Sequence, residues 1–415
     1  MQATELPEAN AQFPPANGPQ IELGQLLFYD PVLSGSGTVA CATCHHPKHG
    51  TSDGVSLGLG DGGIGLGPER TADPDNRPEQ RIPRNSPALF NLGASEFTAF
   101  FHDGRLEETA NGLRTPLGAE MEQGFANALS AQTMFPVLSG DEMAGHYSEN
   151  DVSQAVRQGL ITGPDGAWDK LTKRVEAIPE YRARFDQVIG PKPVHFTDIS
   201  DAIAAFVDFE WRGDNSPFDL YLRGVGDLPD IAMKGMNLFY GAAGCATCHS
   251  GQFQTDHSYH AIAMPQIGPG KAARFERHQR DVGRMRVTGD PADAYRFRTP
   301  SLRNVVQTAP YGHAGTYATL EAAVRHHLDP VGSLMAYDPA QAVLPNLEGQ
   351  RDFAVLADEA EMAVIAAANE LEPVHLEDEE VAAILAFLET LTDPQSIQGA
   401  LGVPESVPSG LLVPR

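Results

Sequence analysis

The four cysteines of the chain lie in two copies of one motif, and each copy ends in a histidine. The motifs are Cys41-Ala42-Thr43-Cys44-His45 and Cys245-Ala246-Thr247-Cys248-His249. Two thiols one helical turn apart can bond covalently to one haem, and the adjacent histidine then binds the iron. A zinc half-site, a redox dithiol or a disulfide also uses two cysteines at this spacing. Because the motif occurs twice and leaves no cysteine over, the sequence favours two covalently bound c-type haems.

The elements that position these motifs are expected to be mostly helical. Apolar residues recur at helical spacing in six stretches: 21–28, 127–161, 168–189, 197–212, 320–327 and 381–391. The 41 glycines and 32 prolines indicate long irregular loops between them. Similar lead-ins, Leu26-Leu27-Phe28-Tyr29 and Asn237-Leu238-Phe239-Tyr240, precede the two motifs. We therefore predict a loose internal repeat of one cytochrome c-like unit.

The repeat and the composition predict four segments. These are an N-terminal arm over 1–20, a first haem domain over 21–212, a second haem domain over 213–405, and a tail over 406–415. The tail ends in Leu412-Val413-Pro414-Arg415, which resembles the remnant of a protease-cleavable tag, so we expect it to lie outside the fold.

Composition also limits the partners and the compartment. A net charge of −26 argues against nucleic acid and against an anionic membrane surface. The chain has no apolar run near 18 residues, so we expect no membrane insertion. Covalent haem attachment takes place outside the bacterial inner membrane, which predicts a periplasmic protein. Met1 begins no basic and apolar leader, so we interpret it as a start placed on a mature chain.

Further phrases in the sequence carry a resemblance to a known family. They are Arg84-Asn85-Ser86-Pro87, Asp103-Gly104-Arg105, Asn215-Ser216-Pro217-Phe218-Asp219, Thr299-Pro300-Ser301-Leu302-Arg303-Asn304 and Thr308-Ala309-Pro310-Tyr311. With the two motifs, and in this order, they resemble the bacterial diheme cytochrome c peroxidases and MauG over roughly residues 21–391. Two more phrases resemble the MauG-like MbnH branch: Gln132-Thr133-Met134-Phe135-Pro136 and Asp141-Glu142-Met143.

The resemblance implies an architecture and a division of labour. Two mostly helical cytochrome c-like domains each hold a haem, and the N-terminal haem reacts with H2O2. One Ca²⁺ is implied between them, held by the side chain of Asn85 and the backbone carbonyls of Thr308 and Pro310. Hard oxygen ligands suit this ion.

The far side of each haem iron is where the chain departs from the classical peroxidases. Those enzymes carry a removable histidine in the loop after the first motif, but residues 50–80 here contain no histidine and no methionine. We therefore expect a five-coordinate haem on His45. At the second haem, the position of the family's methionine or tyrosine ligand is occupied by His327. His326 and Tyr337 stay open as alternatives.

The resemblance also implies a distal carboxylic acid and a residue between the haems. Cleavage of the O–O bond needs a group that takes a proton from peroxide and returns it. Spacing from Pro116 predicts Glu122, and a Glu-Met pairing predicts Glu120. The family's tryptophan before Asp-Gly-Arg is His102 here, and histidine is harder to oxidise.

Three functions follow as hypotheses. The first is a MauG-like enzyme that uses H2O2 to reach a high-valent state with both irons as Fe(IV), and then oxidises a residue, for example a tryptophan, on a partner protein. The second is a peroxidase that reduces H2O2 to water with electrons from a small cytochrome or cupredoxin. The third is a diheme electron-transfer protein without enzymatic activity. The missing loop histidine and the missing methionine favour the first over the second.

Overall fold

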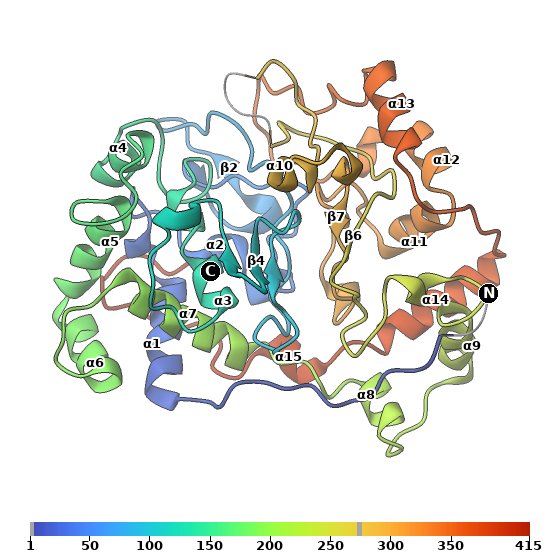
Figure 1. Ribbon diagram of the computed structural model, residues 1–415, viewed down its shortest axis with the longest axis horizontal. Helices are drawn as coiled ribbons and strands as arrows, with labels where there is room; N and C mark the ends of the chain where they lie inside the picture. Colours follow the sequence, from blue (N-terminus) through green and yellow to red (C-terminus); the bar gives the residue numbers. More distant parts are fainter. Residues whose placement is uncertain (1–3, 272–275) are drawn as a thin grey trace.

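The computed structural model describes residues 4–271 and 276–415, which form two mostly helical halves lying side by side (Figure 1). Residues 1–3 of the predicted arm lie outside the described residues. The helices of the first half are α1 Gly18–Tyr29, α2 Cys41–Cys44, α3 Ala128–Thr133, α4 Asp151–Arg157, α5 Ala167–Glu176, α6 Pro179–Ile189 and α7 Phe196–Glu210. Those that follow are α8 Pro217–Leu222, α9 Asp230–Phe239, α10 Met285–Thr288, α11 Leu320–Leu328, α12 Pro330–Met335, α13 Glu359–Ala367, α14 Asp378–Glu389 and α15 Pro394–Gln398. The predicted fold class is confirmed.

The internal repeat appears as two equivalent pairs of crossing helices, α1 with α7 and α9 with α14. Gly24 of α1 lies against Ala202 of α7, so close that an added Cβ would come 1.8 Å from the carbonyl oxygen. Gly235 of α9 approaches Ala383 of α14 to the same 1.8 Å. Both glycines come five residues before the tyrosine that ends the lead-in to a haem motif. Only glycine permits so close a crossing, so both halves use the same device to pack the helix that precedes the haem motif.

Regular strands are few and short, and all of them pair antiparallel. They are β1 Gly63–Ile64 with β2 Thr71–Ala72, then β3 Ala99–Phe100 with β4 Leu106–Thr109 and β5 Gly112–Arg114, and β6 Tyr259–His260 with β7 Phe297–Arg298. Phe100 pairs with Leu106, so the residues between them form a tight turn. This turn holds His102 and Arg105 beside the first haem motif.

One predicted helix is wrong in extent. The stretch 127–161 contains only two short α-helices, α3 and α4, and residues 134–150 between them are irregular apart from one 3-10 turn over Pro136–Leu138. Asn127 accepts a hydrogen bond from the backbone N–H of Ser130 and so begins α3. Pro136, Gly140 and Gly145 explain the irregular span, because neither residue type supports a helix interior.

The two ends of the chain tie the halves together. In the arm, the N–H of Thr4 donates to the carbonyl of Tyr240 at 2.8 Å, and the N–H of Asn10 donates to Gln252 at 2.9 Å. The arm then runs along the second half to α1, as the dark-blue trace in Figure 1 shows. It therefore contacts both haem domains.

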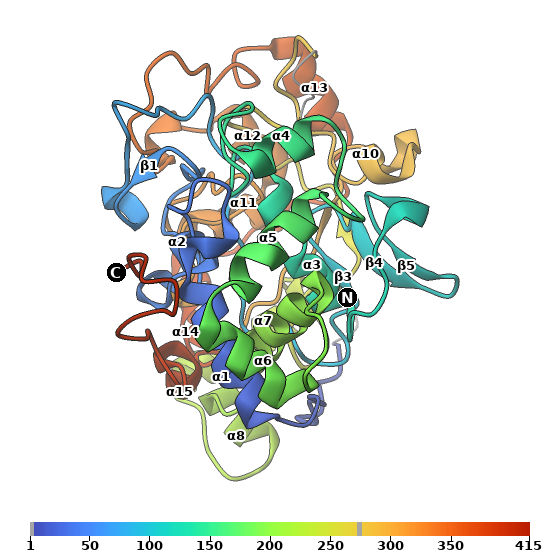
Figure 2. The ribbon, with the colours of Figure 1, turned by 90° about the vertical axis from the view of Figure 1, so that its left-hand side faces the viewer.

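The tail is a correction to the sequence-based expectation, because it packs on the first half (Figure 2). The Ser409 hydroxyl donates to Asp30 at 2.6 Å, and Val407 is buried. The N–H of Leu401 donates to Glu210 in α7 at 2.7 Å. Leu401 and Ser409 therefore contact the first half, and the predicted domain bounds stay a prediction. Among the described residues, no helix combines the length and apolar character needed to cross a membrane.

Candidate functional site

The first motif is folded so that its two thiols and its histidine face one cavity. Cys41 and Cys44 begin and end the single-turn helix α2, which puts both sulfurs on one side. None of the four cysteines of the chain is joined to another in a disulfide. Nδ1 of His45 lies 3.0 Å from the carbonyl oxygen of Thr51, so this nitrogen is the donor and Nε2 carries the lone pair. Burial lowers the pKa of His45, which keeps the ring neutral and able to bind a metal.

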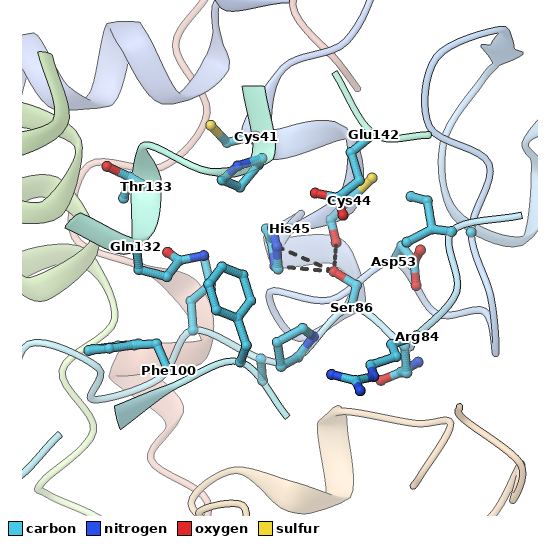
Figure 3. Close-up of a pocket in the computed structure, with 18 of the residues that line it drawn as sticks. Cys41, Cys44, His45, Asp53, Arg84, Ser86, Phe100, Gln132, Thr133 and Glu142 are labelled. Carbon is cyan, nitrogen blue, oxygen red and sulfur yellow. Dashed lines mark hydrogen bonds between the residues drawn. The ribbon is translucent and has the colours of Figure 1, made fainter. Parts of the chain in front are cut away.

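The cavity in front of this motif is open to solvent and has mostly apolar walls. The space between its walls is about 1330 Å³ when the open solvent at its mouth is included. Its walls are apolar over much of their area and include Phe28, Leu129, Ile203 and Val207. Figure 3 shows His45 in the middle of this space, with Gln132 and Thr133 on one side and Glu142 on the other.

Glu142 lies in the irregular span after α3, and its side chain reaches the cavity of the first haem motif. Its side chain lines the cavity together with Gln132 and Pro136. Burial raises the pKa of Glu142, while the positive charges of Lys271 and Arg105 and a hydrogen bond from Ser139 act in the opposite direction. A carboxyl group whose pKa lies above its ordinary value is a candidate to take up and return a proton.

The predicted distal acids, Glu120 and Glu122, do not reach this cavity. Glu120 ends an exposed 3-10 turn over Gly118–Glu120. Glu122 is half-buried, and His195 and the backbone of Gly163 are among its neighbours. The phrases Gln132-Thr133-Met134-Phe135-Pro136 and Asp141-Glu142-Met143 already indicate that this part of the chain resembles the family. Counting from Pro116, however, does not reach Glu142. Because residues 134–150 are irregular, no helical spacing connects Pro116 with the cavity.

A second buried carboxyl group, Asp53, was also missed by the sequence analysis. It lines the same cavity from the loop after the first motif, and burial raises its pKa to about 7. Its Oδ1 accepts the backbone N–H of Val55 at 3.2 Å, which fixes its orientation. The cavity is therefore polar at one end and apolar elsewhere.

His102 lies in the wall of the cavity that faces the second half. Its Nε2 donates to the carbonyl oxygen of Asn85 at 2.9 Å, and its own carbonyl accepts the N–H of Arg298 at 2.8 Å. Burial, aided by the charge of Arg84, lowers the pKa of His102 to about 4, so the ring is neutral. This residue therefore joins the first haem domain to the second through its backbone.

A buried ion network lies next to His102. Arg84 forms two hydrogen bonds with Asp281 of the second half, at 2.7 and 2.8 Å, and a salt bridge with Asp103 at 2.6 Å. Burial alone would raise the pKa of Asp281, but the Arg84 charge lowers it to about 2. The network connects two family phrases, Arg84-Asn85 and Asp103-Gly104-Arg105, to the opposite domain.

The residues expected around calcium come from segments that meet at the same boundary. The N–H of Asn85 donates to the carbonyl of His313 at 2.9 Å, which brings Asn85 to the stretch that follows Pro310. The side-chain nitrogen of Asn85 donates to the carbonyls of Val55 and Ser56, at 2.9 and 3.3 Å. The amide oxygen therefore points the other way. The roles of Asn85, Thr308 and Pro310 as calcium ligands stay a prediction.

The second motif repeats the same arrangement. Cys245 begins a 3-10 turn over Cys245–Thr247, and the N–H of His249 returns to the carbonyl of Cys245 at 3.0 Å. Nδ1 of His249 lies 3.0 Å from the carbonyl oxygen of Gln254, as His45 lies from Thr51. Burial, together with His327, lowers the pKa of His249 to about 4. Nε2 of this neutral ring is therefore available to a metal.

Of the three residues expected opposite His249, only His327 has an available donor atom. Its Nδ1 lies 2.7 Å from the carbonyl oxygen of Ala323, which leaves Nε2 free to bind. His326 uses Nδ1 with the Tyr317 hydroxyl at 2.9 Å and Nε2 with the carbonyl of Ile262 at 2.8 Å. The hydroxyl of Tyr337 donates to the carbonyl of Thr316 at 2.6 Å.

The distance between His249 and His327 fits one metal between them. The centres of their rings are 6.1 Å apart. Two imidazoles that bind one metal from opposite sides, each nitrogen about 2 Å from it, hold their ring centres about 6 Å apart. The thiols, histidines and first cavity thus fit two haem c groups, with His249 and His327 as the predicted ligand pair of the second.

The sequence matches the family model "Di-haem cytochrome c peroxidase" over residues 18–227. A methylamine utilization protein MauG of Methylorubrum extorquens is 32% identical over 328 residues, which are 78% of this chain and 71% of that protein. The chain belongs to the di-haem cytochrome c peroxidase family. A cytochrome c551 peroxidase of Nitrosomonas europaea is 31% identical over 75% of this chain and 73% of its own. The chain is thus an oxidoreductase of this family and about equally similar to both kinds of relative.

Solved structures of the family share the fold. A MauG-like protein associated with microbial copper homeostasis gives a TM-score of 0.57 at 24% identity, covering 96% of this chain and 95% of its own. The diheme peroxidase BthA from Burkholderia thailandensis gives 0.62 at 19% identity, covering 100% and 97%. These similarities extend the two-domain cytochrome c-like architecture over the whole chain.

Another pair of phrases by which the sequence resembles this family meets inside the second domain. Arg303 forms two hydrogen bonds with Asp219, at 2.6 and 2.8 Å, and both side chains are buried. Arg303 also donates to the hydroxyl of Ser216 at 3.1 Å. These phrases therefore maintain the packing of the second domain rather than line the first cavity.

Proposed function

We propose that the protein is a periplasmic MauG-like enzyme that uses H2O2 to oxidise a residue, with tryptophan the first choice, on a partner protein. The observation that carries this is the pair of unlike sites. One histidine faces a cavity with a buried carboxyl group, and the other faces a second histidine. An open site can admit peroxide, and a site closed by two imidazoles can store and pass on charge.

Haem held on His45 would supply peroxide reduction, and haem held by His249 and His327 would supply a second redox centre. Glu142 takes a proton from the attacking peroxide oxygen and returns it to the departing oxygen as water leaves. Gln132, on the opposite wall, positions the small substrate by hydrogen bonds, and the apolar walls exclude bulk water. Two electrons then return from the partner protein.

Ca²⁺ on Asn85, Thr308 and Pro310 forms part of the same proposal. It would hold the boundary between the domains rigid, because these ligands come from segments on both sides of it. Hard oxygen ligands are what this ion prefers. Its loss on chelation should alter the spectra of both haems.

One experiment separates this function from peroxide reduction with an external donor. The holoenzyme is mixed with H2O2 and each soluble protein encoded beside it, and the proteins are analysed by intact-mass and peptide mass spectrometry. A mass change at one tryptophan that requires both enzyme and peroxide supports the proposal. Rapid peroxide consumption with a reduced cytochrome or cupredoxin, and no protein modified, would support the peroxidase instead.

A protein that only transfers electrons between two haems does not need a proton-exchanging group such as Glu142. The cavity at His45 and its carboxyl groups have no use in a protein that only relays electrons. If the resting holoenzyme does not react with H2O2, both enzymatic functions are wrong and this role remains.

A further inference from the structure

Tyr317 is a buried tyrosine beside the second haem site, and its hydroxyl is hydrogen-bonded to His326. The oxygen lies 2.9 Å from Nδ1 of the imidazole, and only 3% of the residue is exposed. On the other side of the ring, Nε2 lies 2.8 Å from the carbonyl oxygen of Ile262. A carbonyl can only accept, so Nε2 carries the proton and Nδ1 is the acceptor. The Tyr317 hydroxyl therefore donates to Nδ1 of His326.

The rings around Tyr317 form a continuous path from the second haem site toward the surface. The ring centres of His327 and His326 are 5.9 Å apart, and those of His326 and Tyr317 are 5.2 Å apart. Tyr317 then meets Tyr337 edge to face, with centres 5.6 Å apart. Tyr337 is partly exposed, and its neighbours Ala336 and Asp338 are exposed. Every step is a direct ring contact.

What distinguishes Tyr317 is the partner of its hydroxyl. Tyr337 donates to the backbone carbonyl of Thr316, and Tyr311 donates to the backbone carbonyl of Val305. A backbone carbonyl cannot take up a proton, whereas an imidazole nitrogen can. A phenol becomes a strong acid when it loses an electron, so its oxidation is easiest where a base already accepts its hydrogen bond. Tyr317 has such a base, and these two tyrosines do not.

We infer that Tyr317 is the redox relay through which oxidising equivalents leave the second haem. The inference rests on the proposed function, which supplies the oxidant as H2O2. Tyr317 gives one electron to the oxidised second haem, and its phenolic proton moves along the existing hydrogen bond to Nδ1 of His326. A neutral tyrosyl radical remains. One electron from the partner protein, passed through the contact with Tyr337, and the return of the proton restore Tyr317.

The test is electron paramagnetic resonance of the holoenzyme, frozen after one equivalent of H2O2 and without a partner protein. We expect a tyrosyl radical whose hyperfine pattern narrows when ring-deuterated tyrosine is incorporated. Tyr317→Phe should abolish this signal and slow the return of the oxidised haems to the resting state about tenfold, which is about 1.4 kcal/mol in barrier height. Tyr311→Phe removes a nearby hydroxyl that lacks a base and should leave both readouts unchanged.

Tyr337 tests the outer part of the path. Tyr337→Phe should keep the Tyr317 radical but slow its reduction by ferrocyanide added to the solution, because phenylalanine keeps the ring contact but is much harder to oxidise than tyrosine. A tyrosyl signal of equal size in Tyr317→Phe would overturn the inference. So would a wild-type enzyme whose haems are oxidised by peroxide without any tyrosyl signal. Haem spectra that do not respond to peroxide would instead show that the proposed function itself is wrong.

Discussion

The two haem sites are alike on the side of the motif histidine and differ in the residues that face this histidine. Each motif follows a helix whose glycine lies five residues before the tyrosine of the lead-in, and each histidine directs Nδ1 at a backbone carbonyl 3.0 Å away. Opposite His45 there is a cavity with Glu142 in its wall, and opposite His249 there is the ring of His327. The repeated unit thus provides haem attachment alone. We expect the segments that follow each motif to determine the reactivity of each site.

The segments that carry His327 and Glu142 differ in secondary structure. His327 lies on α11, where the helical backbone fixes its direction and the carbonyl of Ala323 holds its Nδ1. Glu142 lies in the irregular span after α3, which is held by packing against the loop that follows the first motif. A helix provides a rigid ligand, whereas a loop leaves room for a substrate. The predictions below test whether these two features account for the difference between the sites.

Removing the second imidazole should have the largest effect, because it makes the second site resemble the first. In His327→Ala the low-spin ferric signal should be lost completely and replaced by a second high-spin signal. Electron paramagnetic resonance and the visible spectrum of the resting holoenzyme measure this. His326→Gln is the matched control and should keep the low-spin signal, since both of its ring nitrogens are already engaged. A low-spin signal that survives in His327→Ala would contradict the ligand assignment.

Neutralising the distal carboxyl group should have the next largest effect. Glu142→Gln should slow the reaction of the resting enzyme with H2O2 by about 10²–10⁴-fold, the usual contribution of a general acid-base group. Stopped-flow absorbance measures the rate. Because burial raises the pKa of Glu142, the wild-type rate should fall as the pH drops below this raised pKa, and the variant should lose that dependence.

Glu122→Gln is the control for this prediction. It makes the same chemical change outside the cavity and should leave the rate and its pH dependence as in the wild type. Equal rates for the wild type and Glu142→Gln would remove Glu142 from the mechanism.

The boundary between the sites should be sensitive to its buried ion network. Asp281→Asn leaves Arg84 paired with Asp103 alone, and it should lower the free energy of unfolding by about 1.5–3 kcal/mol, the usual contribution of a hydrogen bond to a charged group. The pKa of Asp281 is about 2 in the folded state, below its value of about 3.9 in an unfolded chain. This carboxylate therefore stabilises the fold above about pH 4, and that contribution is lost as the pH falls toward 2.

Urea unfolding of the holoenzyme between pH 3 and 7 measures this effect. Asp338→Asn, at an exposed position, is the control and should unfold like the wild type. If Asp281→Asn unfolds with wild-type stability at pH 7, the network does not stabilise the domain boundary.

The comparison of the two sites also explains what the sequence could predict. The proximal sides belong to short motifs with local backbone geometry, so the sequence alone predicts the cysteines, His45 and His249 as the residues that hold haem. His327 was identified by its position in the family pattern, and the structure places it 6.1 Å from His249, ring centre to ring centre. In both cases local backbone geometry fixes the side chain.

Glu142 could not be assigned in this way, because its position depends on contacts between distant loops. Its neighbour Gly60 comes from the loop after the first motif, more than eighty residues earlier in the chain. No periodicity links these two segments, so counting from Pro116 selected Glu120 and Glu122 instead. The tail was misjudged for the same reason, since its contacts with Asp30 are long-range.

A substitution at Gly60 should have the smallest of the expected effects on the first site. An added Cβ at this position would lie 2.1 Å from the carbonyl oxygen of Asp141 and 2.7 Å from the Cα of Glu142. Real Cβ atoms do not come this close to backbone, so Gly60→Ala must shift the strand of chain that carries Glu142. A misplaced general base loses part of its contribution, and we expect the peroxide reaction to slow by about tenfold. The second haem should keep its low-spin spectrum, because the change is confined to the first cavity.

Gly140→Ala is the matched control in the same irregular span, where the nearest atom to an added Cβ is 3.5 Å away, and it should react like the wild type. Equal slowing in both variants would mean that any alanine in this region impairs the enzyme, and that the approach of Gly60 to Glu142 has no special role.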